Sequence, residues 1–323
     1  MTTLRLWLDR RKAPRRAAAP GGQRRLALTA LLAVGMLLIT AAAVLLTRGP
    51  GSANAQGVTA GSRHTAGDPS ARADPSPAPS QDAAQLQAMA LTQGQAATWI
   101  SQQVSPDAIV ACDPAMCSAL QARGLTASQL LVLRPGAADP LGSDIVVATA
   151  AIRSQFGASL AGVYAPLVIA SFGSGPEQID VRDIAPDGAA AFQAALAADH
   201  QARVTAGKQL ARNRRITTTA AVRTALAGGD VDPRLLVVLA ALSGQQAVRV
   251  EAFGDPSPGA DGLPLRSAQL GAASAGKLRA MLSFLRAQRS PYLAAQIATV
   301  SGGRHLISIQ FNAPSPLGLA NAP

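Results

Sequence analysis

The sequence is poor in aromatic residues, in cysteine and in acidic residues, and each shortage narrows the possible functions. Phe, Trp and Tyr make up only 3% of the 323 residues, so few rings are present on which nucleic-acid bases could stack. The two cysteines have no further ligand nearby that would complete a zinc site. Asp and Glu number 18 against 29 Lys and Arg, which gives a net charge of +11.

Most of this positive charge lies at the N-terminus. Residues 1–25 hold eight basic residues and one acidic residue, a net charge of +7, and the other 298 residues share +4. Residues 26–47 follow without a charge or a proline, and as a helix they would span about 33 Å, enough to cross a bilayer. The positive charge on the N-terminal side predicts that residues 1–25 are cytoplasmic and that the rest is extracytoplasmic. We therefore expect membrane lipid as a partner and no nucleic acid.

The mode of anchoring has two readings. The length of the apolar segment favours an uncleaved, single-pass transmembrane helix. A cleaved signal peptide is the alternative, because Ala53-Asn54-Ala55 has the small residues of a cleavage site. Residues 48–80 are rich in Pro, Gly and Ser and are predicted to be a flexible linker.

Beyond the linker, short apolar segments alternate with helical patterns, which is typical of α/β proteins. The fold class predicted is therefore one or two α/β units with a mostly parallel sheet, because nearly all-apolar strands indicate a sheet covered on both faces. Residues 296–300 and 306–311 predict a C-terminal hairpin around Ser301-Gly302-Gly303-Arg304. The predicted organisation is an α/β domain at 81–213, a second α/β unit at 214–312 and a frayed tail at 313–323.

Cys112 and Cys117 are separated by four residues, at the end of a predicted strand and within the following helix. A disulfide is chemically allowed in an exported domain, and the turn could bring the two Cα atoms close enough. A pair of small buried thiols fits the same pattern. The spacing differs from that of a redox motif, in which two residues separate the cysteines.

The candidates for catalysis are few. Ser171 and Ser174 lie in a glycine-rich segment after a strand, where an α/β enzyme could carry a nucleophile, but neither a nucleophile elbow nor a dinucleotide-binding motif is complete. Asp180 and His200 are the remaining residues that could transfer a proton. Since no nucleophile, base and orienting group can be assembled, we expect no enzymatic activity and no cofactor.

One basic run remains outside the N-terminus. Between His200 and Gly229 the chain has six basic residues and no acidic one. Such a run is usually a solvated helix face, but outside the cytoplasm it could bind anionic partners such as lipid head groups or wall polymers. The residues of this predicted patch are Arg203, Lys208, Arg212, Arg214, Arg215 and Arg223.

Two segments carry a resemblance to a known family. Trp99-Ile100 with Val104-Ser105-Pro106-Asp107-Ala108 and Asp113, and Ala170 to Gly175 with Ile179 to Arg182, are similar to the soluble extracytoplasmic region of bacterial polytopic mannosyltransferase-like glycosyltransferases. The resemblance covers residues 96–190, and the whole chain resembles single-pass envelope proteins of actinobacteria. The glycosyltransferases carry catalytic carboxylates among many membrane helices, and this chain has one predicted helix, so the resemblance implies an accessory or binding role.

Together these features predict a membrane-anchored, extracytoplasmic protein that serves as a non-catalytic binding or assembly module of the cell envelope. Its partners would be membrane lipid, envelope proteins or anionic wall polymers. The alternative is an envelope enzyme acting on glycan or peptidoglycan, with Ser171, Ser174, Asp180 and His200 as its candidate residues.

Overall fold

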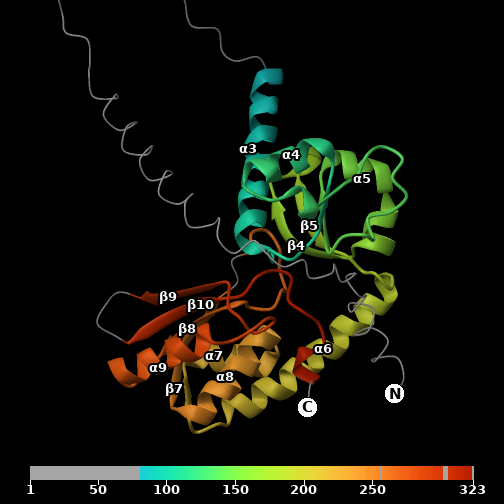
Figure 1. The fold of residues 1–323 in the computed structure, drawn as a ribbon. Helices are drawn as coiled ribbons and strands as arrows, with labels where there is room; N and C mark the ends of the chain where they lie inside the picture. Colours follow the sequence, from blue (N-terminus) through green and yellow to red (C-terminus); the bar gives the residue numbers. More distant parts are fainter. Residues whose placement is uncertain (1–80, 255–256, 301–304, 322–323) are drawn as a thin grey trace, which may run out of the picture. The chain divides into compact units, whose positions relative to one another are not determined.

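The computed structural model describes residues 81–254, 257–300 and 305–321, all within one compact unit of residues 75–323 (Figure 1). The predicted cytoplasmic tail, transmembrane helix and linker lie outside the described residues. Among the helices that are described, none combines the length and the apolar character needed to cross a membrane. The described residues form an α/β fold with two five-stranded sheets.

The first sheet has the strand order β2-β1-β3-β5-β4. Its elements are α3 (Gln81–Gln103), β1 (Val110–Cys112), α4 (Pro114–Ala122), β2 (Leu130–Val132), β3 (Ile145–Ala148), α5 (Ala150–Phe156), β4 (Leu167–Phe172) and β5 (Ile179–Asp183). Four strands run in one direction, and β5 is antiparallel to both of its neighbours. Apolar residues of α3 and α4 pack on one face, and those of α5 pack on the other, so both faces are covered.

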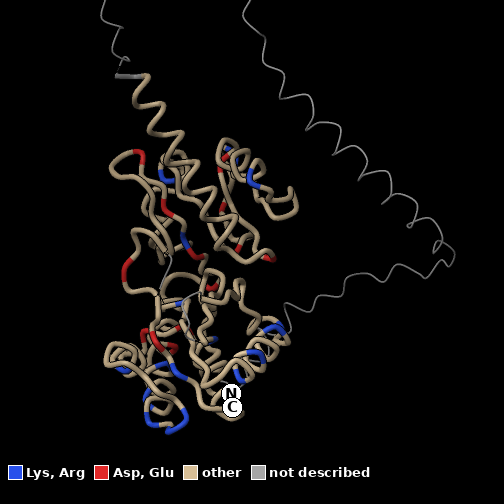
Figure 2. The backbone as a smooth tube through the Cα atoms, turned by 90° about the vertical axis from the view of Figure 1, so that its left-hand side faces the viewer, with Lys and Arg blue, Asp and Glu red and all other residues tan. Residues whose placement is uncertain are grey.

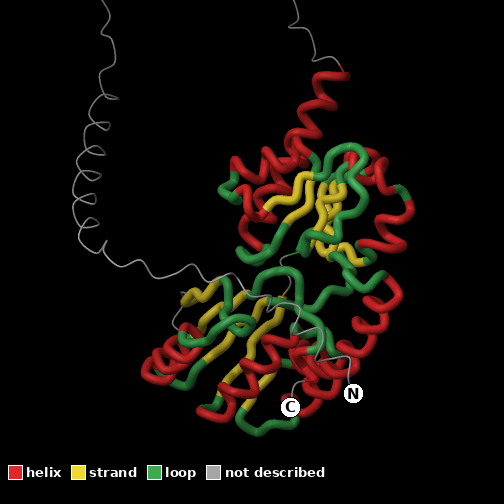
Figure 3. The backbone as a smooth tube through the Cα atoms, turned by 45° about the vertical axis from the view of Figure 1, so that its right-hand side comes forward, coloured by secondary structure: helices red, strands yellow, loops and turns green. Residues whose placement is uncertain are grey.

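The second sheet has the strand order β6-β7-β8-β10-β9. Its elements are α6 (Ala189–Ala211), β6 (Ile216–Thr218), α7 (Ala220–Gly228), α8 (Pro233–Gln245), β7 (Val248–Gly254), β8 (Ser267–Gly271), α9 (Ala275–Arg286), β9 (Gln296–Val300) and β10 (Leu306–Gln310). Only β6 and β7 pair in parallel. Figure 3 shows the strands and helices of both sheets.

The second sheet buries one face only. Val248, Val250 and Leu270 point into a core shared with α7, α8 and α9, whereas Arg249 and Gln269, which alternate with them, lie on the other face. This alternation is characteristic of a sheet with one solvated side. The predicted α/β class is therefore confirmed, but the prediction of a mostly parallel sheet is wrong, because both sheets are mixed.

Several helices begin at capping residues in the sequence. Asp113 accepts hydrogen bonds from the first backbone amides of α4, and Pro114 occupies the first helical position. Asp232 and Ser274 cap α8 and α9 in the same way. The strands β9 and β10 pair antiparallel, as a hairpin requires; their connecting turn lies outside the described residues.

The C-terminal segment differs from the prediction of a frayed tail. Ala313 is buried and forms a bridge with Val104, at the end of α3. The Ser315 hydroxyl donates to Asp232 at 2.6 Å, and the Gly318 amide donates to Asp199 at 2.9 Å. Residues 313–321 are therefore held by buried carboxylates, which composition alone did not reveal.

Candidate functional site

The carboxyl ends of four strands meet at one edge of the first sheet, which is where open α/β sheets commonly bind ligands. The chain passes from β1 to β2 on one side and then from β2 back across β1 to β3 on the other, so the strand order reverses beside β1. Asp113 follows β1, and Thr149 follows β3. The Thr149 hydroxyl donates to the Asp113 carboxylate, which also caps α4.

Arg153 links this edge to the loop before β5. Its guanidinium donates to the carbonyl oxygens of Ala148 and Pro176, each at 2.7 Å, and to that of Gln178. Sequence reasoning missed this arginine, because its partners are backbone oxygens that no motif marks. The side chains of Asp113, Thr149 and Arg153 therefore all form hydrogen bonds to other groups of the chain.

The structure brings together two of the predicted catalytic residues. Ser171 on β4 lies opposite Asp180 on β5, and its hydroxyl donates to the Asp180 carboxylate at 2.7 Å. The Gln178 side chain donates to the same carboxylate oxygen at 2.7 Å, and Arg182 contacts the other oxygen at 3.4 Å. The backbone amide of Ser171 donates to the carbonyl oxygen of Pro258. Ser171 is thus fixed within the sheet.

The other two candidates have different partners. Ser174 is exposed and precedes a short 3-10 helix, with no capping hydrogen bond from its side chain. His200 lies on α6, and its Nε2 is 3.0 Å from the carbonyl oxygen of Gly228. A Ser, His and Asp arrangement for acyl transfer needs a hydrogen bond between the serine and the histidine, and Ser171 bonds to Asp180 instead.

Cys112 and Cys117 form a disulfide between the end of β1 and the first turns of α4, with Cα atoms 5.4 Å apart. Both residues are buried, at 0% and 3% exposure. Of the two readings of this pair, the structure contains the bonded one. The bridge fastens the turn that also presents Asp113.

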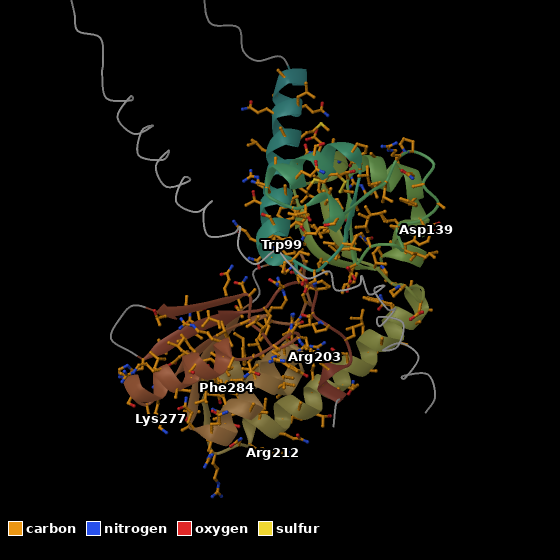
Figure 4. The ribbon with its side chains drawn as sticks, viewed as in Figure 1. Trp99, Asp139, Arg203, Arg212, Lys277 and Phe284 are labelled. Atoms are coloured by element: carbon orange, nitrogen blue, oxygen red, sulfur yellow. A yellow bond between two sulfur atoms is a disulfide. The ribbon has the colours of Figure 1, made fainter. Side chains whose placement is uncertain are left out.

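The predicted basic patch is divided by the structure. Arg203 is buried and pairs with Asp199 at 2.7 Å, and it also donates to the carbonyl oxygen of Gly229. Its inclusion among the surface residues was therefore wrong, because α6 turns that side chain into the interior (Figure 4). The other five residues of the patch are exposed.

Four of these exposed residues lie at the end of α6 or just beyond it, and a residue from another helix joins them. The Arg215 side chain donates to the carbonyl oxygens of Ser243 and Gly244 at the end of α8. Next to them, the Gln246 side chain donates to the carbonyl oxygen of Lys277 in the first turn of α9. We call the resulting cluster the basic end; it consists of Lys208, Arg212, Arg214, Arg215 and Lys277.

The two halves of the described chain carry opposite charge. Residues 81–188 contain 4 Lys and Arg and 9 Asp and Glu, a net charge of −5. Residues 189–323 contain 14 and 6, a net charge of +8. Figure 2 shows that most Lys and Arg positions lie in the part that carries the second sheet.

Two hollows are large enough for a small ligand. One has a volume of about 460 Å³ and lies between the ends of α3 and α4 and the start of β9, with Arg123, Gln129 and Asn312 among its polar residues. The other, of about 400 Å³, is lined by α6, by residues 257–266 and by the C-terminal segment. His200 and Arg203 line the second hollow beside apolar residues.

A pair of carboxylates lies at the other end of the strands of the first sheet, opposite the end that carries Asp113 and Thr149. Asp183 ends β5, and Asp144 precedes β3, to which β5 is paired. Burial, together with the charge of Asp144, raises the pKa of Asp183 to about 7. Burial also lowers the pKa of Arg182, although the charge of Asp180 opposes this effect.

In the part of the chain that the structure describes, no group of three or more His, Cys, Asp or Glu side chains is placed to hold a metal ion.

Comparisons with protein-family models, with curated proteins and with solved structures gave no match to this chain.

Proposed function

We propose that the chain is a single-pass, membrane-anchored protein whose α/β part lies outside the cytoplasm and serves as a non-catalytic binding or assembly module of the cell envelope. The predicted transmembrane helix at residues 26–47 and the basic tail before it support the location. The disulfide of Cys112 and Cys117 agrees with it, because such bonds persist in oxidising compartments.

The observation that carries the non-catalytic role is the bonding of Ser171. Its hydroxyl donates to Asp180, and its amide donates to Pro258, so both groups hold β4 in place. Asp180 in turn accepts from Gln178 and lies beside Arg182. The hydroxyl and the carboxylate that an acyl-transfer enzyme would use are therefore both bonded to other groups of the same sheet.

A complementation experiment tests the proposal against an envelope enzyme acting on glycan or peptidoglycan. Cells lacking the chain would receive full-length Ser171→Ala, His200→Ala or, as a matched control, the exposed Ser118→Ala. We expect all three variants to restore growth under envelope stress by detergent. Loss of growth with Ser171→Ala or His200→Ala, at normal protein level and melting temperature, would favour the enzyme.

Binding and topology can be tested in the same cells. A photo-cross-linking residue at Gln193, which lines the 400 Å³ hollow, should capture an envelope component, whereas one at the exposed Gln121 on α4 should not. An impermeant thiol reagent should label a Gln121→Cys variant in intact cells. Labelling only after cell lysis would overturn the orientation.

A further inference from the structure

Four of the five side chains of the basic end have no internal partner among the described residues, and Arg215 bonds only to backbone carbonyl oxygens. The side chains of Lys208, Arg212, Arg214 and Lys277 are exposed, and among the described residues none forms an ion pair or a side-chain hydrogen bond. Lys208 and Arg212 are one turn apart on α6, so their like charges repel each other. Such a cluster destabilises the isolated fold and is relieved by a negatively charged partner.

Two acidic residues of the same half, Asp230 and Asp232, lie at the other end of the strands of the second sheet. The basic end surrounds the starts of β6 and β7, where the Val248 amide donates to the carbonyl oxygen of Arg215. Asp230 and Asp232 instead exchange backbone hydrogen bonds with Leu265, in the segment that follows β7. The positive charge is therefore concentrated at one edge and is not offset by nearby carboxylates.

The composition of the basic end favours phosphate groups. Three of its five residues are arginines, whose planar guanidinium groups bind phosphate oxygens in pairs. The first turn of α9 carries Lys277, whose own amide is capped by the Ser274 hydroxyl, and the positive end of the helix dipole lies at the same edge. The charges come from separate elements and face solvent. This arrangement fits several phosphates spaced along a polymer better than it fits one small anion.

The basic end and the start of α3, where the predicted linker joins the described part, are well separated within the fold. The tether would enter at the start of α3, which projects from the first sheet (Figure 1). Figure 4 shows Arg212 and Lys277 at the opposite end of the described part from that start.

We propose that the basic end binds a linear polymer of phosphodiester-linked units on the outer side of the membrane. This inference rests on the proposed function, of which it specifies the ligand class. Binding is electrostatic, so it weakens as salt rises, in the way known for proteins on other phosphate polymers.

The test uses the full-length chain in neutral detergent micelles, titrated calorimetrically with poly(glycerol phosphate) at several salt concentrations. Arg212→Glu/Arg214→Glu should weaken binding about tenfold or more and should reduce the slope of log affinity against log salt by about 2. The matched control is Arg123→Glu/Arg134→Glu, which makes the same charge change at exposed residues of the first half. It should leave affinity within about twofold.

Three results would overturn the proposal: equal losses in both double variants, binding of inorganic phosphate as tight per site as the polymer, or binding of vesicles of phosphatidylglycerol but not of the polymer. Melting temperatures establish that each variant is folded. Failure here is distinguishable from failure of the proposed function, because cross-linking at Gln193 and complementation by Ser171→Ala do not depend on the basic end.

Discussion

Reduction of the Cys112–Cys117 disulfide provides a quantitative test of the fold. The bridge closes a short loop, because its cysteines are separated by 5 in sequence. For a loop of this length, the chain-entropy relation gives about 7 cal/mol/K of lost freedom in the unfolded state, which amounts to about 2 kcal/mol at 25 °C. In a domain of this size, that loss should lower the melting temperature by about 4 to 8 °C.

The loss should stay close to the entropic value, since little else changes on reduction. The thiol of Cys117 lies 3.2 Å from the carbonyl oxygen of Cys112, so the reduced side chain keeps a hydrogen-bond acceptor. Both side chains remain in the core beside Met116 and Leu120. A larger destabilisation would mean that the turn after β1 rearranges when the bond is broken.

Differential scanning calorimetry of the full-length chain with and without a phosphine reductant measures the effect. The Cys112→Ala/Cys117→Ala variant is the control and should melt at one temperature under both conditions. Oxidised and reduced wild-type protein melting within about 1 °C of each other would refute the reasoning. Two thiols titrated in the unfolded, unreduced protein would show that no bond forms.

Two further perturbations test other parts of the structure. Gly207→Ala on α6 should destabilise the fold by about 1 to 3 kcal/mol in urea titrations, because a Cβ there would lie 1.9 Å from the carbonyl oxygen of Leu226 on α7; unchanged stability would mean that the helices are farther apart. Asp183→Asn should stabilise the fold at pH 8 by at most about 4 kcal/mol but not at pH 4, with the exposed Asp187→Asn as a control. The pKa of Asp183 is raised from 3.8 to about 7 on folding. The wild-type side chain therefore costs no stability below about pH 4, and the cost grows as the pH rises from about 4 to about 7. An equal gain at both pH values would contradict this explanation.

The sequence predicted elements best where local signals are strong. Asp113-Pro114 and Asp232-Pro233 marked helix starts, because an acidic cap followed by proline has few other uses. The apolar pattern also indicated where strands occur, but it did not indicate their direction. An apolar strand such as Ile145–Ala148 pairs in parallel with one neighbour and antiparallel with the other, so its composition is compatible with both. That ambiguity led to the wrong prediction of mostly parallel sheets.

Two elements of the second half escaped prediction for physical reasons. Strand β8 has only two apolar residues that face the core, Ala268 and Leu270. They lie among glycine and polar residues, so the alternation of apolar and polar positions is too short to recognise. Helix α7 begins directly after β6 at the Thr219 cap, without a loop that would separate the two. Tertiary packing sets β8, whereas α7 has local signals in its Thr219 cap and Gly229 end that the adjoining strand obscured.

The candidate site was predictable only in part. Ser171 and Asp180 were both singled out, yet their mutual hydrogen bond depends on the register of β4 against β5, which the sequence does not state. Lys277 joins the basic end from a helix more than 60 residues beyond Arg215, so no window of sequence contains them both. Conversely, the sequence does not distinguish the buried Arg203 from its exposed neighbours, because its pairing with Asp199 is evident only in the structure.

The anchoring of the C-terminal segment has a consequence for how the chain is made. The Gln310 side chain donates to Gln103, 207 residues earlier, and the Ala313 amide donates to the carbonyl oxygen of the same residue. During synthesis, α3 therefore cannot form this contact until the residues around Gln310 have been added. Contacts of such long range slow folding, and the half-finished chain would expose the buried carboxylates Asp199 and Asp232 and the apolar surface around them. The early segments of the chain would therefore need protection from aggregation until the residues around Gln310 have been synthesised.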